Sequence, residues 1–297
     1  MVSVIIPTLN AENYIDGLLS SLCGQTVECE IIIVDSSSLD RTTSIAASGN
    51  AKIVKVRKEN FNHGKARNIG VQETTGDIVV FLTQDALPFD KHCLENLLQL
   101  LESSEIVASY GRQMPRSDAS PVEGFARLFN YDDKPMIKGR EDLSSLGIKT
   151  FFFSNVCSAI KTKEFKELGG FPENIVMFED LIFAAKAILK GYKIAYVPEA
   201  KVFHSHNFSL MQQFHRYLDA GISLRNNAWI FEHAKANREG AEFLKQEIAY
   251  LSKNHQYQWI PYAIGESVFK FAGFWLGLHG INPRRKNTGV APTIYNA

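Results

Sequence analysis

The chain has 297 residues, of which 45% are hydrophobic and 22% are charged, a balance typical of one large globular domain or two modest ones. Its 32 lysine and arginine residues equal its 32 aspartate and glutamate residues, so no overall positive field favours nucleic acid. The 4 cysteines form no C-x-x-C pair and suit a reduced cytoplasm, and the N-terminus has neither the basic region nor the cleavage site of a signal peptide.

Residues 1–114 alternate between short apolar runs and amphipathic segments with helical spacing. This alternation predicts a parallel sheet with helices on both faces. No G-x-G-x-x-G follows the first apolar run, so the dinucleotide-binding form of such a fold is not expected. The predicted strands are Val2–Ile6, Glu30–Val34, Lys52–Val56 and Ile78–Leu82, and a further apolar run occupies Val107–Tyr110.

Beyond residue 114 the alternation ends, and we divide the chain into a core of residues 1–206 and a helical C-terminal region of residues 207–297. Within the core, residues 1–114 form the first half and residues 115–206 the second. The elements expected in the second half and beyond are a helix near Val122–Phe129, extended chain at Thr150–Ile160, a helix at Glu179–Lys190, short strands at Lys193–Val197 and Lys201–His204, and helices from Leu210 onward.

Polar residues follow the ends of the predicted strands. In an open parallel sheet, ligands bind beyond the carboxyl ends of the strands, so these side chains should share one edge. Each also has an ordinary use as a turn residue, a helix cap or a solvated charge. Together they offer acceptors for a base, cations for phosphate and a carboxylate for a metal, which is what a nucleotide diphosphate requires. These residues are Thr8, Asn10, Asp35, Lys65, Arg67 and Asp85.

The chain resembles family 2 glycosyltransferases of the GT-A fold at five places in order: Val4–Asn10, Ile33–Asp40, Gly64–Gly70, Phe81–Asp85 and Glu179–Asp180. The resemblance covers residues 1–206 and implies an α/β fold with a mostly parallel central sheet and a C-terminal helical extension. It implies that residues 1–114 are the nucleotide-binding half of this domain and residues 115–206 the acceptor half. It implies that Asp35 binds the imide of a pyrimidine base and that Asp85 holds Mg²⁺ or Mn²⁺ under the diphosphate. The other residues that it places at the donor are Pro7, Thr8, Asn10, Lys65, Arg67 and Gln84.

The usual D-x-D motif of that family is replaced here by Thr83-Gln84-Asp85. This form, with His63–Asn68 upstream, resembles the rhamnosyltransferase branch, which implies dTDP-rhamnose as donor. A UDP-sugar remains the alternative donor.

Two carboxylates begin the helix predicted at Glu179–Lys190. Acidic residues are common in the first turn of a helix, where they face the positive end of the dipole. The resemblance implies that Asp180 is the general base that takes the proton of the acceptor hydroxyl during inverting transfer. Spacing alone leaves Glu179 as an alternative base, and we assign Glu179 and Asn155 to the acceptor site.

His204 and His206 lie two residues apart at a strand end, so both side chains should point to one side. The resemblance implies that a histidine at this place joins the metal, and we expect His204 to be the second ligand beside Asp85. A structural zinc site is not favoured, because no cysteine pair accompanies the histidines.

The segment Trp259–Leu278 is rich in apolar residues but is interrupted by Glu266 and Lys270. A membrane-spanning helix needs about 20 mostly apolar residues, so we do not favour one. Core packing, a homodimer contact and a helix lying in the membrane interface remain open, the last supported by the basic run Arg284–Lys286.

We therefore predict an inverting glycosyltransferase that moves L-rhamnose from dTDP-rhamnose to a lipid-linked or growing saccharide of bacterial surface polysaccharide, such as O-antigen. It would use a divalent cation and act in the cytoplasm, at the inner face of the plasma membrane. A sugar nucleotidyltransferase would need a glycine- and arginine-rich loop where this chain has Thr8–Asn10. A catalytically inactive sugar-nucleotide binder is the other alternative, favoured by Thr83 and opposed by Asp180 and His204.

Overall fold

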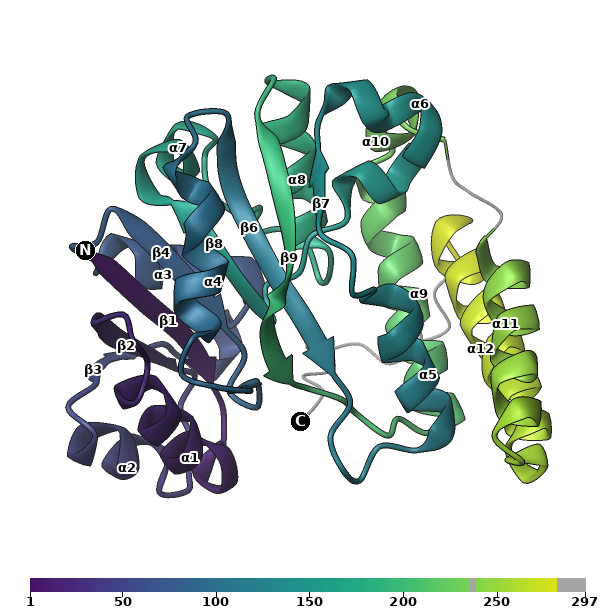
Figure 1. The fold of residues 1–297 in the computed structure, drawn as a ribbon, viewed down its shortest axis with the longest axis horizontal. Coiled ribbons are helices and arrows are strands. Elements are labelled where there is room, and N and C mark those ends of the chain that lie inside the picture. The colour runs from purple at the N-terminus through teal and green to yellow at the C-terminus, as the bar shows by residue number, and fades with distance from the viewer. Residues whose placement is uncertain (236–238, 282–297) are drawn as a thin grey trace.

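The computed structural model describes residues 1–235 and 239–281. Its strands form one nine-stranded sheet in the order β3-β2-β1-β4-β8-β6-β9-β5, with β7 paired to β9 (Figure 1). The strands are β1 Val2–Thr8, β2 Cys29–Asp35, β3 Lys52–Lys55, β4 Ile78–Leu82, β5 Leu87–Pro88, β6 Ile106–Met114, β7 Met136–Lys138, β8 Cys157–Lys161 and β9 Lys193–Phe203.

The sheet is mostly parallel, as predicted, because β1, β2, β3, β4, β6 and β9 run in one direction. Strand β8 lies between β4 and β6 and runs opposite to both. The segment Thr150–Ile160, predicted to be extended, begins as the end of a 3-10 helix at Gly147–Phe151 and becomes a strand only at Cys157. This reversal brings the start of β8 beside the carboxyl end of β4.

The prediction of separate strands at Lys193–Val197 and Lys201–His204 is wrong, because β9 continues through both. Its register with β6 shifts where Gly111 pairs with Val197 and the next residue, Arg112, pairs with Lys201. The residues skipped in the register include Pro198, which has no backbone N–H to donate, so it is accommodated at an irregularity in a continuous strand.

Helices cover both faces of the sheet, as the alternating pattern predicted (Figure 1). Successive residues of β1 point to opposite faces: Val4 and Ile6 pack against helices at Glu12–Cys23 and Cys93–Leu98, whereas Ile5 packs against helices at His63–Gln72 and Glu179–Leu189. The helices of the core are α1 Glu12–Cys23, α2 Thr42–Ser48, α3 His63–Gln72, α4 Cys93–Leu98, α5 Pro121–Asn130, α6 Leu143–Leu146, α7 Thr162–Glu167 and α8 Glu179–Leu189. Short 3-10 turns lie at Lys58–Asn60, Gln99–Glu102, Arg140–Asp142, Gly147–Phe151 and Tyr257–Trp259.

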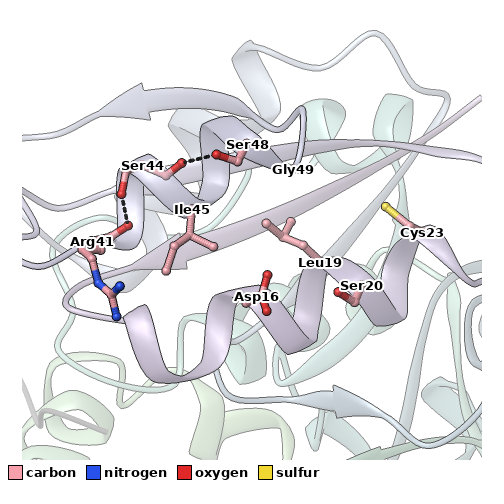
Figure 2. Close-up of a pocket in the computed structure, with 9 residues that line it drawn as sticks. All are labelled: Asp16, Leu19, Ser20, Cys23, Arg41, Ser44, Ile45, Ser48 and Gly49. Atoms are coloured by element: carbon pink, nitrogen blue, oxygen red, sulfur yellow. Dashed lines mark hydrogen bonds between the residues drawn. The ribbon is translucent and has the colours of Figure 1, made fainter.

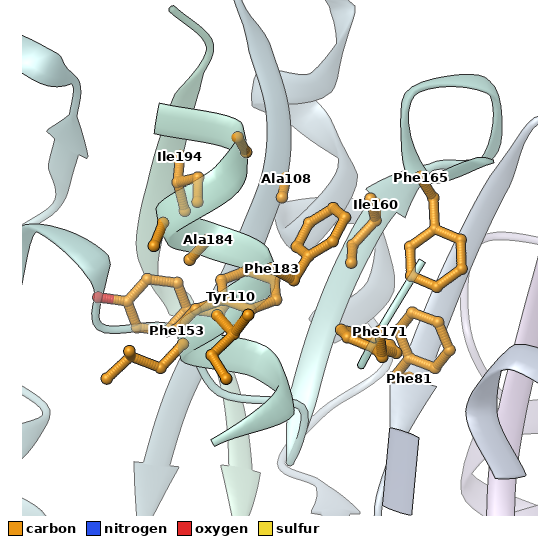
Figure 3. Packing of buried hydrophobic residues seen from close by; sticks show 14 of the residues in the cluster. Phe81, Ala108, Tyr110, Phe153, Ile160, Phe165, Phe171, Phe183, Ala184 and Ile194 are labelled. Atoms are coloured by element: carbon orange, nitrogen blue, oxygen red, sulfur yellow. The ribbon is translucent and has the colours of Figure 1, made fainter. Parts of the chain in front are cut away.

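An aromatic cluster joins β4 to the segment that leads into α8 (Figure 3). The ring of Phe171 lies 5.2 Å from that of Phe81, 4.9 Å from Phe165 and 5.5 Å from Phe183. Aromatic pairs at such distances contribute about 0.5–1.5 kcal/mol each beyond the burial of their surface. Gly170, at φ +65°, makes the turn that delivers Phe171 into the cluster. The segment that leads into α8 is therefore packed through Phe171 against Phe81, near the end of β4.

The C-terminal helices are α9 Leu210–Asn226, α10 Ile230–His233, α11 Glu239–Lys253 and α12 Ile260–Leu278. Glycines let α9 and α12 approach closely, since a Cβ on Gly277 would lie 2.2 Å from the carbonyl oxygen of Leu218. One face of α12 therefore packs within the protein, while Ile264, Val268, Phe271 and Trp275 are exposed on another face. None of the helices in the described part of the chain is long and apolar enough to cross a bilayer. The basic run Arg284–Lys286 lies outside the described residues.

Candidate active site

The ends of β1 and β2 form one polar corner. Thr8 pairs in register with Asp35, and its hydroxyl donates to Asp35 Oδ2 at 3.3 Å. The backbone N–H of Ser38 donates to Asp35 Oδ1 at 3.0 Å, and Asp35 is only 1% exposed. Asn10, at φ +50°, accepts the N–H of Leu39 at 2.9 Å. The two loops are thus bound to each other with the Asp35 carboxylate held in place.

The Thr83-Gln84-Asp85 segment leaves β4 beside this corner. Gln84 Oε1 accepts the N–H of Leu9 at 2.9 Å, and its amide nitrogen donates to the carbonyl of Leu9 at 3.4 Å. Gln84 therefore binds the loop after β1 rather than presenting a free amide, while Pro7 is a half-buried member of β1. The segment is further fixed because Thr83 N–H donates to the carbonyl of Val156 at 3.3 Å.

Asp85 lies against two histidines that follow β9. Its Oδ2 is 3.1 Å from His206 Nε2 and 3.5 Å from His204 Nε2. We expected His204 beside Asp85, and the structure places His206 against the same carboxylate as well, because the loop after β9 turns both imidazoles towards it. Ligand atoms of the three residues all lie within 4.8 Å of one another.

The charge states at this cluster favour a cation. Burial disfavours ionisation of Asp85, but its interactions with the neighbouring histidines, chiefly the hydrogen bond from His206, outweigh the burial and lower the pKa of Asp85. Burial lowers the pKa of His204 to about 3, so this imidazole is neutral and keeps a lone pair. One carboxylate and two imidazoles are a donor set that fits a divalent ion such as Mn²⁺, since imidazole is a poorer ligand for Mg²⁺.

Glu179 and Arg67 form a buried ion pair at the start of α8. Arg67 Nη1 lies 3.0 Å from Glu179 Oε1, and the two residues are 3% and 7% exposed. The charge of Arg67, which we had expected beside the donor, is thus directed at Glu179. Lys65 is half-buried and forms no ion pair within residues 1–235 and 239–281. Of Lys65 and Arg67, which both belong to the helix α3, Lys65 is thus the one left to meet an anionic ligand.

Asp180 occupies the first turn of α8, after Phe178, which has a left-handed φ of 71°. Its Oδ2 accepts the N–H of Asn155 at 3.2 Å and its Oδ1 accepts the N–H of Leu181 at 2.8 Å. Burial, and next the charge of Glu179, raise the pKa of Asp180 to about 7. A carboxyl that titrates near neutral pH can accept a proton under physiological conditions.

Asn155 lies between the carboxylates at the start of α8 and the Thr83-Gln84-Asp85 segment. Its backbone holds Asp180, while its side chain lies 3.5 Å from Glu179 and accepts the hydroxyl of Ser158 at 3.1 Å. The next residue, Val156, accepts the N–H of Thr83. The structure therefore brings Asp35, Asp85, Asp180 and the two histidines to one edge of the sheet.

Sequence reasoning missed several side chains at this edge. Arg116 donates to the carbonyl of Asp85 at 3.3 Å, and its guanidinium lies 5.3 Å from the ring centre of Tyr14. Gln113 and Arg127 lie behind His204. Only His206 had a signal in the sequence, namely its spacing of two from His204.

An open groove of about 490 Å³ lies elsewhere, between α1 and α2 (Figure 2). Its walls include Leu19, Cys23, Arg41 and Ile45. None of the predicted site residues lines it, so we do not include it in the candidate site.

Comparison with known proteins gives one family. The profile of the family described as Glycosyl transferase family 2 matches residues 3–169. The O-antigen chain rhamnosyltransferase RfbN of Salmonella typhimurium is 40% identical over 282 residues, covering 94% of this chain and 90% of that protein. The O-antigen chain rhamnosyltransferase WbaN of Salmonella anatum is 44% identical over 252 residues, covering 84% of this chain and 80% of that protein.

Solved structures share the fold at lower identity. The mannosyltransferase PcManGT from Pyrobaculum calidifontis, in complex with GDP-Man and Mn²⁺, has a TM-score of 0.65 at 18% identity, covering 95% of this chain and 88% of its own. S. aureus TarS 1-349 in complex with UDP-GlcNAc has a TM-score of 0.56 at 17% identity, covering 94% and 90%.

Proposed function

This chain belongs to glycosyl transferase family 2, and from that premise we propose that it transfers L-rhamnose from dTDP-rhamnose to a saccharide acceptor of O-antigen synthesis. That it is an inverting glycosyltransferase follows from the family and from its relatives. The observation that carries the rhamnose proposal is the identity of 40% and 44% to two O-antigen chain rhamnosyltransferases over most of the chain.

The polar corner at the ends of β1 and β2 supports the proposal that the donor carries a pyrimidine base. The Asp35 carboxylate, held by Thr8 and Ser38, is an acceptor for the imide N–H that thymine and uracil share. Adenine has an acceptor nitrogen in place of this N–H, and guanine carries its N–H on a larger, bicyclic ring, so we expect ADP and GDP to bind more weakly than dTDP or UDP. We choose dTDP over UDP because of the sugar implied by the relatives.

The metal proposal concerns Asp85, His204 and His206. These residues would hold Mn²⁺ or Mg²⁺ beside the diphosphate of the donor. Such an ion, when bound, neutralises negative charge that develops on the departing nucleotide diphosphate. Lys65 and Arg116 add positive charge near the same edge and would help to hold the phosphates.

The base proposal concerns Asp180. Its carboxylate would accept the proton of the acceptor hydroxyl while that oxygen attacks the anomeric carbon and the bond from this carbon to the diphosphate breaks. Glu179 is the less suitable candidate, since its carboxylate is already engaged by the Arg67 guanidinium at 3.0 Å. Asn155 positions Asp180 through its backbone N–H.

We further propose that the protein acts at the inner face of the plasma membrane on a lipid-linked acceptor. The exposed face of α12 supports this, with Ile264, Val268, Phe271 and Trp275 at helical spacing and exposed by 43%, 58%, 70% and 44%. An apolar face of this kind can enter the interface of a bilayer. The basic sequence Arg284–Lys286 follows it closely and would favour anionic lipid.

The test is a transfer assay with purified protein, a panel of dTDP-, UDP- and GDP-sugars, and lipid-linked saccharide acceptors. We expect dTDP-rhamnose to give acceptor-dependent release of dTDP and a product longer by one deoxyhexose. Preference for another sugar nucleotide would overturn the donor assignment. Binding of dTDP-rhamnose without transfer to any acceptor would favour an inactive binder.

A further inference from the structure

Behind His204 lies a chain of buried and partly buried polar side chains that come from three different parts of the fold. Gln113 comes from β6 and is 2% exposed, Arg127 comes from α5, and His204 follows β9. Arg127 Nη1 donates to Gln113 Oε1 at 2.5 Å, and His204 Nδ1 lies 2.9 Å from the same oxygen. Both the guanidinium and the imidazole therefore meet one amide atom.

The guanidinium of Arg127 shows that the atom of Gln113 at this contact is the amide oxygen and not the nitrogen. Arginine has only N–H donors and stays charged, so the atom of Gln113 that faces Arg127 must be the oxygen. The amide nitrogen of Gln113 then points the other way, where it donates to the Tyr131 hydroxyl and to Ser154 Oγ at 3.0 Å. Both of these oxygens can accept, so this orientation satisfies the whole amide.

The orientation of the Gln113 amide determines which ring nitrogen of His204 carries the hydrogen. Because an amide oxygen can only accept, His204 Nδ1 must carry the hydrogen in this contact. A neutral imidazole with its hydrogen on Nδ1 has its lone pair on Nε2. That atom is the one that faces Asp85 at 3.5 Å and His206 at 3.1 Å.

The same network also holds the second histidine. Glu123 Oε1 accepts from Arg127 Nε at 2.7 Å and from the backbone N–H of His206 at 3.2 Å. Glu123 and Arg127 are one turn apart on α5, whose start is capped by Ser120. A single helix thus sets the orientation of Gln113 and the position of the loop that carries both histidines.

We propose that Arg127 and Gln113 are positioning residues that hold His204 in the Nδ1–H form, with its Nε2 lone pair directed into the cation site. This inference rests on the proposed metal function of Asp85, His204 and His206. Metal-binding histidines commonly donate their other ring N–H to such a partner, and losing the partner weakens metal binding about 10- to 100-fold.

The experiment measures Mn²⁺ affinity by the electron paramagnetic resonance signal of free Mn²⁺, with dTDP present. We expect Gln113→Leu to raise the dissociation constant for Mn²⁺ about 10- to 100-fold. Gln113→Glu keeps an acceptor for both His204 and Arg127 and should stay within a few-fold of wild type. Tyr131→Phe is the matched control, since it removes a contact on the nitrogen side of Gln113 only, and it should leave Mn²⁺ affinity unchanged.

The outcomes distinguish a wrong positioning role of Gln113 from a wrong cation site at Asp85, His204 and His206. If Asp85→Asn leaves Mn²⁺ affinity unchanged, the cation site itself is wrong. If Asp85→Asn weakens Mn²⁺ binding but Gln113→Leu does not, only the positioning role is wrong. Should Gln113→Leu fail to fold, a long-range ¹H–¹⁵N spectrum of the wild-type protein, assigned with His204→Gln, decides. Protonated Nδ1 on His204 supports the proposal, and protonated Nε2 overturns it.

Discussion

Replacing Asp180 by asparagine tests the proposed base most directly. The amide keeps the size of the side chain but cannot take a proton from the acceptor hydroxyl. A positioned base contributes about 10²- to 10⁴-fold in rate. At 1.36 kcal/mol for each factor of ten, this corresponds to about 3–5 kcal/mol of barrier. We expect a loss of this size in transfer rate. The affinity for dTDP should stay close to wild type, because Asp180 contacts Asn155 and Leu181 rather than the polar corner at the ends of β1 and β2.

The pH dependence gives a second signature. Because burial and Glu179 raise the pKa of Asp180 to about 7, its ionised fraction should grow from about one tenth at pH 6 to about nine tenths at pH 8. The transfer rate of the wild-type protein should therefore rise about tenfold over this interval. The residual rate of Asp180→Asn should lack this rise.

Stability provides a readout independent of activity. The pKa of Asp180 is raised from 3.8 to about 7 in the folded protein, so the folded state holds a proton that the unfolded chain releases. The resulting contribution to the free energy of unfolding is fully present below the unfolded pKa and is lost as pH rises through 7. The Tm of Asp180→Asn relative to wild type should accordingly increase from pH 5 to pH 8.

The assays are dTDP release at several pH values and thermal unfolding of both proteins at pH 5 and pH 8. Transfer by Asp180→Asn within a few-fold of wild type would refute the assignment of the base. A Tm difference that does not change with pH would refute the raised pKa.

Glu179→Gln should lower the free energy of unfolding in urea by about 3–5 kcal/mol, because it leaves the buried charge of Arg67 without its partner. The exposed pair of Lys193 serves as control, and Lys193→Gln should cost less than about 1 kcal/mol; equal losses in both variants would contradict the burial argument. Removing divalent cations with EDTA should weaken dTDP binding and stop transfer, and full activity after this treatment would return the Asp85 cluster to a structural role. Phe271→Ser should weaken binding to anionic liposomes about 10- to 150-fold, since burying a phenylalanine side chain contributes about 1.5–3 kcal/mol and each factor of ten in affinity is about 1.4 kcal/mol. Met136→Ser, an exposed apolar change on β7, should have no effect in the same sedimentation assay, and similar losses in both variants would contradict a specific α12 interface.

Local sequence was sufficient to predict the strands and helices of the first half of the fold, residues 1–114. The strands β1, β2 and β4 are short apolar runs ended by polar residues, and such a pattern depends only on neighbouring residues in the chain. Since parallel strands end at a common edge, the sequence also predicted that Asp35 and Asp85 lie at one side of the sheet. The start of α8 at Glu179 was predicted for the same local reason.

The tertiary structure decided which groups meet. Arg67 and Glu179 are 112 residues apart, and Gln113 and His204 are 91 residues apart, so no local pattern could reveal either contact. The antiparallel β8 carries Asn155 to the backbone of Thr83, which depends on long-range strand pairing. The protonation of each side chain depends on these long-range contacts, because burial and neighbouring charges set its pKa. By itself the sequence therefore determined which residue types stand at the edge of the sheet. Packing between distant segments determined which carboxylate is paired with arginine, which one has its pKa raised to about 7, and which nitrogen of His204 faces Asp85.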